Sequence, residues 1–123
     1  MDKFQATFEI LYLLSTVDGH LADAELEVIK SFILQNNGSI NFNIKQTVDA
    51  VDSLTVDGKW NELIHAAGVI NQVCDAREKN IILDFALRLI AADGKLDPNE
   101  QNIFFGLAKA WNIDAKRFIE ART

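Results

Sequence analysis

The sequence has little of several features on which particular protein classes depend. It contains one cysteine, Cys74, and one proline, Pro98, in 123 residues. A single cysteine excludes an internal disulfide and a four-cysteine zinc cage, and it favours a reducing compartment. Because proline is so rare and apolar residues recur at three- and four-residue spacings, helices should dominate. We therefore expect a cytoplasmic, all-α protein.

Basic residues are scarce relative to acidic ones. Twelve Lys and Arg residues against eighteen Asp and Glu residues give a net charge of −6. An acidic surface repels phosphate backbones and anionic headgroups, so we expect no nucleic-acid partner and no direct membrane insertion. Apolar runs are also too short for a membrane span, which needs ~20 residues, and the first residues do not resemble a cleaved leader. With 49% hydrophobic residues, residues 1–123 should form a single soluble domain.

The apolar pattern predicts about six to seven helices. We expect them over about 4–17, 23–35, 43–52, 59–73, from 75 to the Asp93-Gly94 turn, from 98 to about 110, and briefly after Asp114. The first is apolar nearly all round, which is typical of a helix surrounded by others. The helices over 23–35, from 75 and from 98 should bury one apolar stripe each, with Trp111 continuing the stripe of the last of these.

An internal repeat, which relates the stretch 14–25 to the stretch 89–100, is the most informative feature of the sequence. In each copy an apolar helix ends at Asp-Gly, a leucine follows two residues after the glycine, and a glutamate lies seven residues after the aspartate. The aligned residues are Leu14, Asp18, Gly19, Leu21 and Glu25 in the first copy and Leu89, Asp93, Gly94, Leu96 and Glu100 in the second. The repeat therefore predicts a duplicated helix-loop-helix bundle.

Helix capping explains part of this pattern without a ligand. Gly19 and Gly94 suit the left-handed conformation that commonly ends helices. Asp97, Pro98 and Glu100 fit an N-cap, an N1 proline and the N3 glutamate of a capping box. The first copy has Ala22 at the aligned cap position, so we expect Asp23 to cap and that helix to start one residue later.

Capping leaves two of the acidic residues unexplained. Asp18 and Asp93 lie at helix C-termini, where the helix dipole disfavours negative charge. Each could accept hydrogen bonds from amides of the next helix, or both could bind a cation held between the two loops. Oxygen-only ligation favours calcium or magnesium over zinc. The cap and the metal site are thus two alternative interpretations of the same acids.

The repeat with its flanking residues resembles the TerB family of tellurite-resistance proteins, whose relatives include the N-terminal part of a membrane-anchored DnaJ-type co-chaperone. The resemblance covers almost the whole chain and is strongest in 89–100, followed by Ile103, Leu107 and Ala108, and then 112–114. It implies an all-helical duplicated bundle, a divalent metal site, and a protein partner in stress or tellurite-resistance complexes near the membrane. Carried onto this sequence, the metal site comprises Asp18, Glu25, Asp93 and Glu100, with Asp23 and Asp97 as helpers.

The sequence shows no set of residues typical of an enzyme. It has no nucleophile elbow, no phosphate-binding glycine loop and no His-Glu-x-x-His helix. His20 is expected in a loop, and His65 is mid-helix with no second ligand four residues away. Cys74 is best explained as a packed small apolar group. We therefore expect a non-enzymatic protein, with a metal-free interaction scaffold as the alternative to a metal-binding domain.

Overall fold

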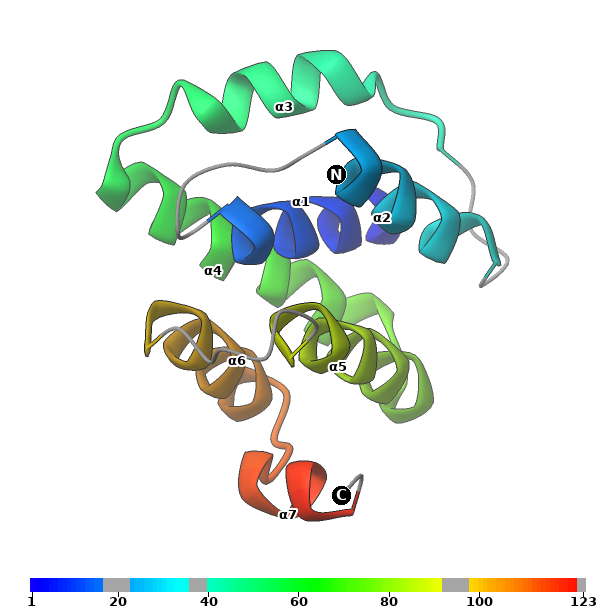
Figure 1. Cartoon of the computed structure of the whole chain (residues 1–123), viewed down its shortest axis with the longest axis vertical. Coiled ribbons are helices and arrows are strands. Elements are labelled where there is room, and N and C mark those ends of the chain that lie inside the picture. Colours follow the sequence, from blue (N-terminus) through cyan, green and yellow to red (C-terminus); the bar gives the residue numbers. More distant parts are fainter. Residues whose placement is uncertain (17–22, 36–39, 92–97, 122–123) are drawn as a thin grey trace.

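The computed structural model describes residues 1–16, 23–35, 40–91 and 98–121; the side chains of 23–25 and 91 are not among those described. The described residues form seven helices and no strand (Figure 1), which confirms the predicted all-α class. The helices are α1 (Lys3–Thr16), α2 (Asp23–Gln35), α3 (Ile44–Asp52), α4 (Val56–Val73), α5 (Ala76–Ala91), α6 (Pro98–Ala110) and α7 (Ala115–Glu120). None of these helices is long and apolar enough to cross a membrane.

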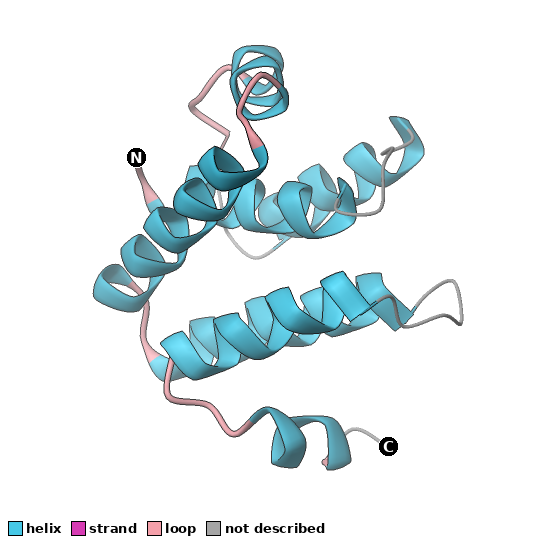
Figure 2. Ribbon diagram, turned by 90° about the vertical axis from the view of Figure 1, so that its left-hand side faces the viewer, coloured by secondary structure: helices cyan, strands magenta, loops and turns pink. Residues whose placement is uncertain are grey.

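Helix α1 is the centre of the bundle, as predicted from its apolar character. It packs against α2, α3, α4, α5 and α6. Every residue from Ala6 to Leu14 is buried, so no face of that stretch is left to solvent. The helices lie in levels, with α3 above α1 and α2, then α5 and α6, and α7 farthest away (Figures 1 and 2).

Helix α4 begins three residues earlier than the sequence pattern predicted. We expected a turn before Lys59, but the helix starts at Val56 with Thr55 as its N-cap. The Thr55 hydroxyl accepts a hydrogen bond from the backbone N–H of Gly58 at 3.0 Å. A Cβ on Gly58 would lie 3.2 Å from that hydroxyl oxygen, so the missing side chain makes room for the cap. The glycine therefore belongs to the first helical turn and does not break the helix.

The pair α1 and α2 and the pair α5 and α6 are offset along the chain by the same number of residues as the two copies of the sequence repeat. Helix α1 ends at Thr16 and α5 at Ala91, while α2 begins at Asp23 and α6 at Pro98. Asp23 is thus the first residue of α2, and the expected start one residue later is wrong. Negative charge in the first turn is favoured by the helix dipole, so an aspartate suits that position.

Side-chain hydrogen bonds between distant segments hold the helices in place. The indole N–H of Trp111 donates to the backbone oxygen of Ala67 at 3.0 Å, which joins the end of α6 to α4. The hydroxyl of Tyr12 donates to Asp52 at 2.7 Å, which joins α1 to α3. Burial, followed by the hydrogen bond to Asp52, raises the pKa of Tyr12. Trp111 and Cys74 are both buried, as predicted.

A Schellman motif ends α6. Asn112 has a φ of 56°, the one positive value among the described residues other than glycine. The N–H of Ile113 donates to the oxygen of Ala108 at 2.8 Å, and that of Asn112 donates to Lys109 at 3.1 Å. These bonds satisfy carbonyl groups that a helix end otherwise leaves unpaired. Asparagine tolerates this left-handed conformation better than most residues other than glycine.

Substituting Asn112 tests whether this turn contributes to stability. Asn112→Ala should lower the free energy of unfolding by about 1 kcal/mol, because alanine bears the full steric cost of the left-handed conformation. Asn112→Gly, the matched control, should be neutral or slightly stabilising. Urea denaturation of the three proteins gives the comparison. Equal stability of the alanine and glycine variants would show that the backbone strain at this turn is negligible.

Candidate functional site

The predicted metal residues lie mainly in and beside the two connections that follow α1 and α5. Asp18, Asp93 and Asp97 lie outside the described residues. Asp23 and Glu25 are in the first turn of α2, with side chains outside the described set. The convergence of the two loops thus stays a prediction. Its predicted donors are all carboxylates, a set that suits a hard cation such as Ca²⁺ or Mg²⁺.

Glu100 is the predicted metal ligand whose side chain is described. It lies in the first turn of α6 and is 6% exposed. The partial positive charge of the helix N-terminus stabilises a carboxylate there. The position agrees with the capping interpretation and leaves the metal interpretation open. Among the residues that the structure describes, no three His, Cys, Asp or Glu side chains form a group that could hold a metal ion.

A second acidic feature lies inside the bundle, where α1 packs against α4. Glu9 of α1 is 4% exposed, and the neighbouring acid that acts on its carboxyl group is Glu62 of α4. The side-chain amide of Gln5 also donates to Glu9, at 3.4 Å. Burial, then the charge of Glu62 and the hydrogen bond with it, raises the pKa of Glu9 to about 7. Glu9 therefore keeps its proton up to near neutral pH, because burial beside another acid disfavours its charged form.

The burial of Glu9 beside Glu62 was not predicted from the sequence, although one signal was present. Glu9 is the one charged residue between Ala6 and Leu14, a stretch in which every side chain is buried. A charge inside a helix that is apolar all round must find a partner or become neutral. Its partner could not be identified from the sequence, because Glu62 lies far along the chain on another helix. His65 continues the polar group, with its Nδ1 3.7 Å from Glu62 Oε1, and its side chain is exposed.

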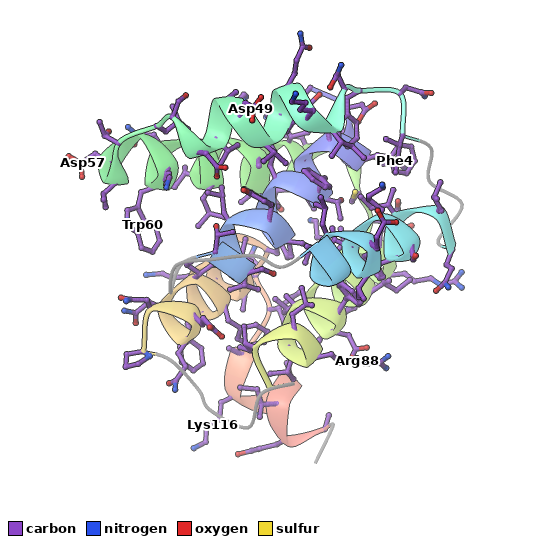
Figure 3. All side chains as sticks on the ribbon, turned by 45° about the horizontal axis from the view of Figure 1, so that its top comes forward. Phe4, Asp49, Asp57, Trp60, Arg88 and Lys116 are labelled. Carbon is purple, nitrogen blue, oxygen red and sulfur yellow. The ribbon has the colours of Figure 1, made fainter. Side chains whose placement is uncertain are left out.

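Cys74 and His65 are two described residues of types that often act in catalysis. Burial raises the pKa of the Cys74 thiol, which disfavours the reactive thiolate. His65 is exposed on α4 without a metal-ligand partner among the described residues. Trp60 projects outward near the start of α4 and is half-exposed (Figure 3). The described residues thus offer a buried acid with a raised pKa and an exposed surface.

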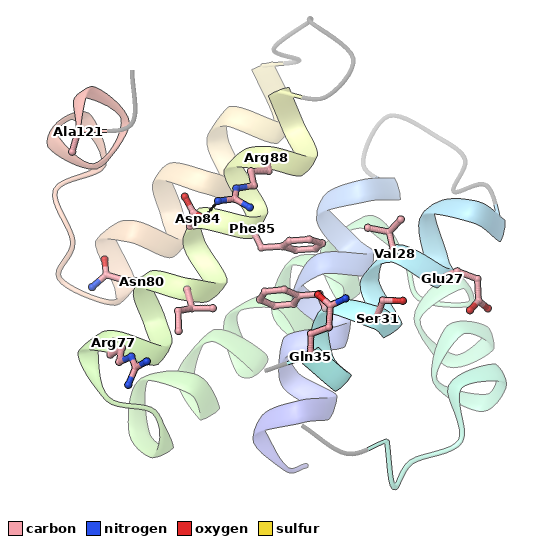
Figure 4. Close-up of a pocket in the computed structure, with 12 residues that line it drawn as sticks. Glu27, Val28, Ser31, Gln35, Arg77, Asn80, Asp84, Phe85, Arg88 and Ala121 are labelled. Atoms are coloured by element: carbon pink, nitrogen blue, oxygen red, sulfur yellow. Dashed lines mark ion pairs between the residues drawn. The ribbon is translucent and has the colours of Figure 1, made fainter. Parts of the chain in front are cut away.

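An open groove of about 1000 Å³ separates α2 from α5 (Figure 4). Its floor is formed by Phe32 and Phe85, whose rings stack with centroids 4.1 Å apart and planes 10° apart. Val28 and Ser31 line it from α2, and Arg77, Asp84 and Arg88 line it from α5. The predicted apolar stripes of α2 and α5 do not pack against each other along their whole length. Their outer edges form the walls of the groove instead.

The described helices form an all-helical bundle around one central helix. Comparison with protein families then identifies the family: the model described as "Tellurite resistance protein TerB" matches residues 4–123. The chain belongs to the TerB family. A search of curated proteins and a search of solved structures gave no significant match. The resemblance to the DnaJ-type co-chaperone stays an expectation.

Proposed function

We propose that this chain is a non-enzymatic, cytoplasmic domain of tellurite resistance or stress response, in which the two Asp-Gly loops form an acidic surface that binds Ca²⁺ or Mg²⁺. The observation that carries the proposal is the family match over residues 4–123. The equal spacing of the two helix pairs supports an equivalent role for both loops. The proposed ligands are Asp18, Glu25, Asp93 and Glu100, with Asp23 and Asp97 as helpers.

The partner in this proposal is a protein, membrane-associated as in the complexes that the family resemblance implies. The net charge of −6 argues against nucleic acid and anionic lipid as partners. A metal-free interaction scaffold is the second candidate function. It is favoured by the open groove between α2 and α5, which needs no ion to expose an apolar floor. In that case the loop carboxylates serve as helix caps.

Thermal unfolding after chelation, with single cations added back, tests the metal site. A cation at about ten times its dissociation constant should stabilise the folded state by about 1.4 kcal/mol. For a domain of this size that corresponds to a rise of about 5 °C in the unfolding midpoint. We expect the rise with Ca²⁺ or Mg²⁺ and its loss in an Asp18→Asn/Asp93→Asn variant, because the ligand oxygens lose their charge.

The matched control removes two other aspartates from the surface. Asp49 of α3 and Asp57 of α4 are exposed (Figure 3), so Asp49→Asn/Asp57→Asn changes the net charge equally without touching either loop. This variant should keep the full response to the cation. A response lost in both variants would indicate general charge screening. The absence of any response in the unmodified protein would favour the metal-free scaffold.

A further inference from the structure

We propose that the groove between α2 and α5 binds an amphipathic helix of a partner protein, with an acidic residue of that helix facing Arg77. This inference rests on the protein-binding part of the proposed function, and it applies whether or not the loops bind metal. The groove provides an apolar floor, two helical walls and an unmatched positive charge. Each of these features restricts the kind of ligand that fits.

The apolar part of the groove is incompletely covered by the protein itself. Phe32 and Phe85 stack on each other but remain half-buried, and Ile81 beside them is also half-buried. Val28, on the α2 wall, is 49% exposed. An aliphatic side chain laid over the stacked rings would remove this apolar surface from water, which is the main source of binding free energy for such a contact.

The walls favour a helix over other ligands. Val28, Ser31, Phe32 and Gln35 line the groove at the i, i+3, i+4, i+7 spacing of one face of α2. The α5 wall extends from Arg77 to Arg88, and a helix rises by about 16 Å over such a stretch. A helix of about three turns matches that length. No strand edge is present among the described residues, so a peptide cannot bind there by extending a sheet.

The charges of the groove indicate the orientation and polarity of the ligand. Arg88 pairs with Asp84 at 3.0 Å, and Glu27 on the opposite wall pairs with Lys30 at 2.9 Å. The guanidinium of Arg77, by contrast, makes no ion pair or hydrogen bond with any residue in the described part of the chain. Figure 4 shows Arg77 at the opposite end of the α5 wall from Arg88. An acidic side chain at the matching end of the ligand would complete the charge pairing.

Two synthetic peptides, each long enough to form a helix and to fill the groove, test this proposal. Both carry leucines at i, i+3, i+4 and i+7; one has glutamates on a single flank of that stripe, and the other has lysines at the same positions. We expect the glutamate peptide to bind the full chain and to shift the amide NMR signals of residues 27–35 and 77–88. Arg77→Ala should raise its Kd about fivefold, measured by fluorescence anisotropy, and leave the weaker binding of the lysine peptide unchanged.

A pair of exposed aliphatic residues provides the matched control. Val28→Asp places a charge on the groove wall and should abolish binding of the glutamate peptide. Ile64→Asp makes the same change on α4, where Ile64 is 66% exposed, and should leave binding intact. Equal effects of these two substitutions, NMR shifts centred elsewhere, or equal binding of both peptides would overturn the proposal.

Three further outcomes separate this inference from its alternatives. Sedimentation of the unmodified chain should show a monomer; a dimer that Val28→Asp dissociates would show that a second copy occupies the groove, and would overturn the proposal. If the peptides do not bind but the response to Ca²⁺ or Mg²⁺ is intact, the groove is not a binding site, and the proposed metal-binding function still stands. Peptide binding with no metal response would support the groove within the metal-free scaffold.

Discussion

Raising the pH from 5 to 8 should lower the free energy of unfolding by about 2 kcal/mol through Glu9. The pKa of this group is about 7 in the folded protein, against an ordinary value of 4.5. Because the folded state holds the proton more tightly, the stabilisation is complete below about pH 4.5 and is lost as the pH rises through 7. Urea denaturation at half-unit pH intervals measures the slope.

Glu9→Gln should flatten this slope and increase stability at pH 8. The amide of glutamine is close in shape to a protonated carboxyl group and can donate a hydrogen bond to Glu62 without titrating. Glu27→Gln, on the exposed side of α2, is the matched control and should leave the slope unchanged. A slope that persists in Glu9→Gln would show that groups other than Glu9 produce the pH dependence.

The chosen pH range separates Glu9 from three other groups whose pKa is shifted, namely Glu78, Cys74 and Tyr12. Glu78 forms an ion pair with Lys3 at 2.9 Å, which lowers the pKa of Glu78. The stability from that ion pair is therefore lost only at acidic pH, below the range measured. Burial raises the pKa of Cys74 and of Tyr12 above their already basic ordinary values. Those two groups therefore stay protonated up to pH 8.

Phe8→Ala should destabilise the domain by about 4 kcal/mol, the largest effect that we expect from a single substitution. Phe8 is fully buried in α1, and its ring lies 6.0 Å from that of Tyr12 and 5.5 Å from that of Phe42, which precedes α3. Removing the ring leaves a cavity where the central helix meets its neighbours, and it also removes both aromatic contacts.

Phe105→Ala provides the comparison on an exposed surface. Phe105 is 44% exposed on α6, so the same chemical change removes less buried area and leaves no closed cavity. We expect a loss below about 1 kcal/mol. Chemical denaturation of both variants gives the two values. Similar losses of stability in the two variants would mean that the core around Phe8 collapses to fill the cavity. We do not expect this collapse, because α1 is closely packed on five helices.

The helices of this protein were predictable because the signals for them are local. Asn43 and Asp114 precede α3 and α7, and each accepts a hydrogen bond from the backbone N–H three residues ahead. The central place of α1 followed from its apolar surface, which only contact with several helices can bury. The predicted start of α4 at about Lys59 was three residues late, because the N–H of Gly58 bonds to the Thr55 cap and the helix already begins at Val56.

The sequence by itself determined the helical class, the duplicated pairs and the family, because periodicity, capping and a spaced motif all operate over a few residues. The tertiary structure alone decided which distant groups meet. It buried Glu9 and placed Glu62 beside it, and these two effects, burial first, raise the pKa of Glu9 to about 7. It also stacked Phe32 on Phe85 while leaving the rest of α2 and α5 apart, which opens the groove. Such contacts depend on how helices pack, and packing is set by the whole core at once.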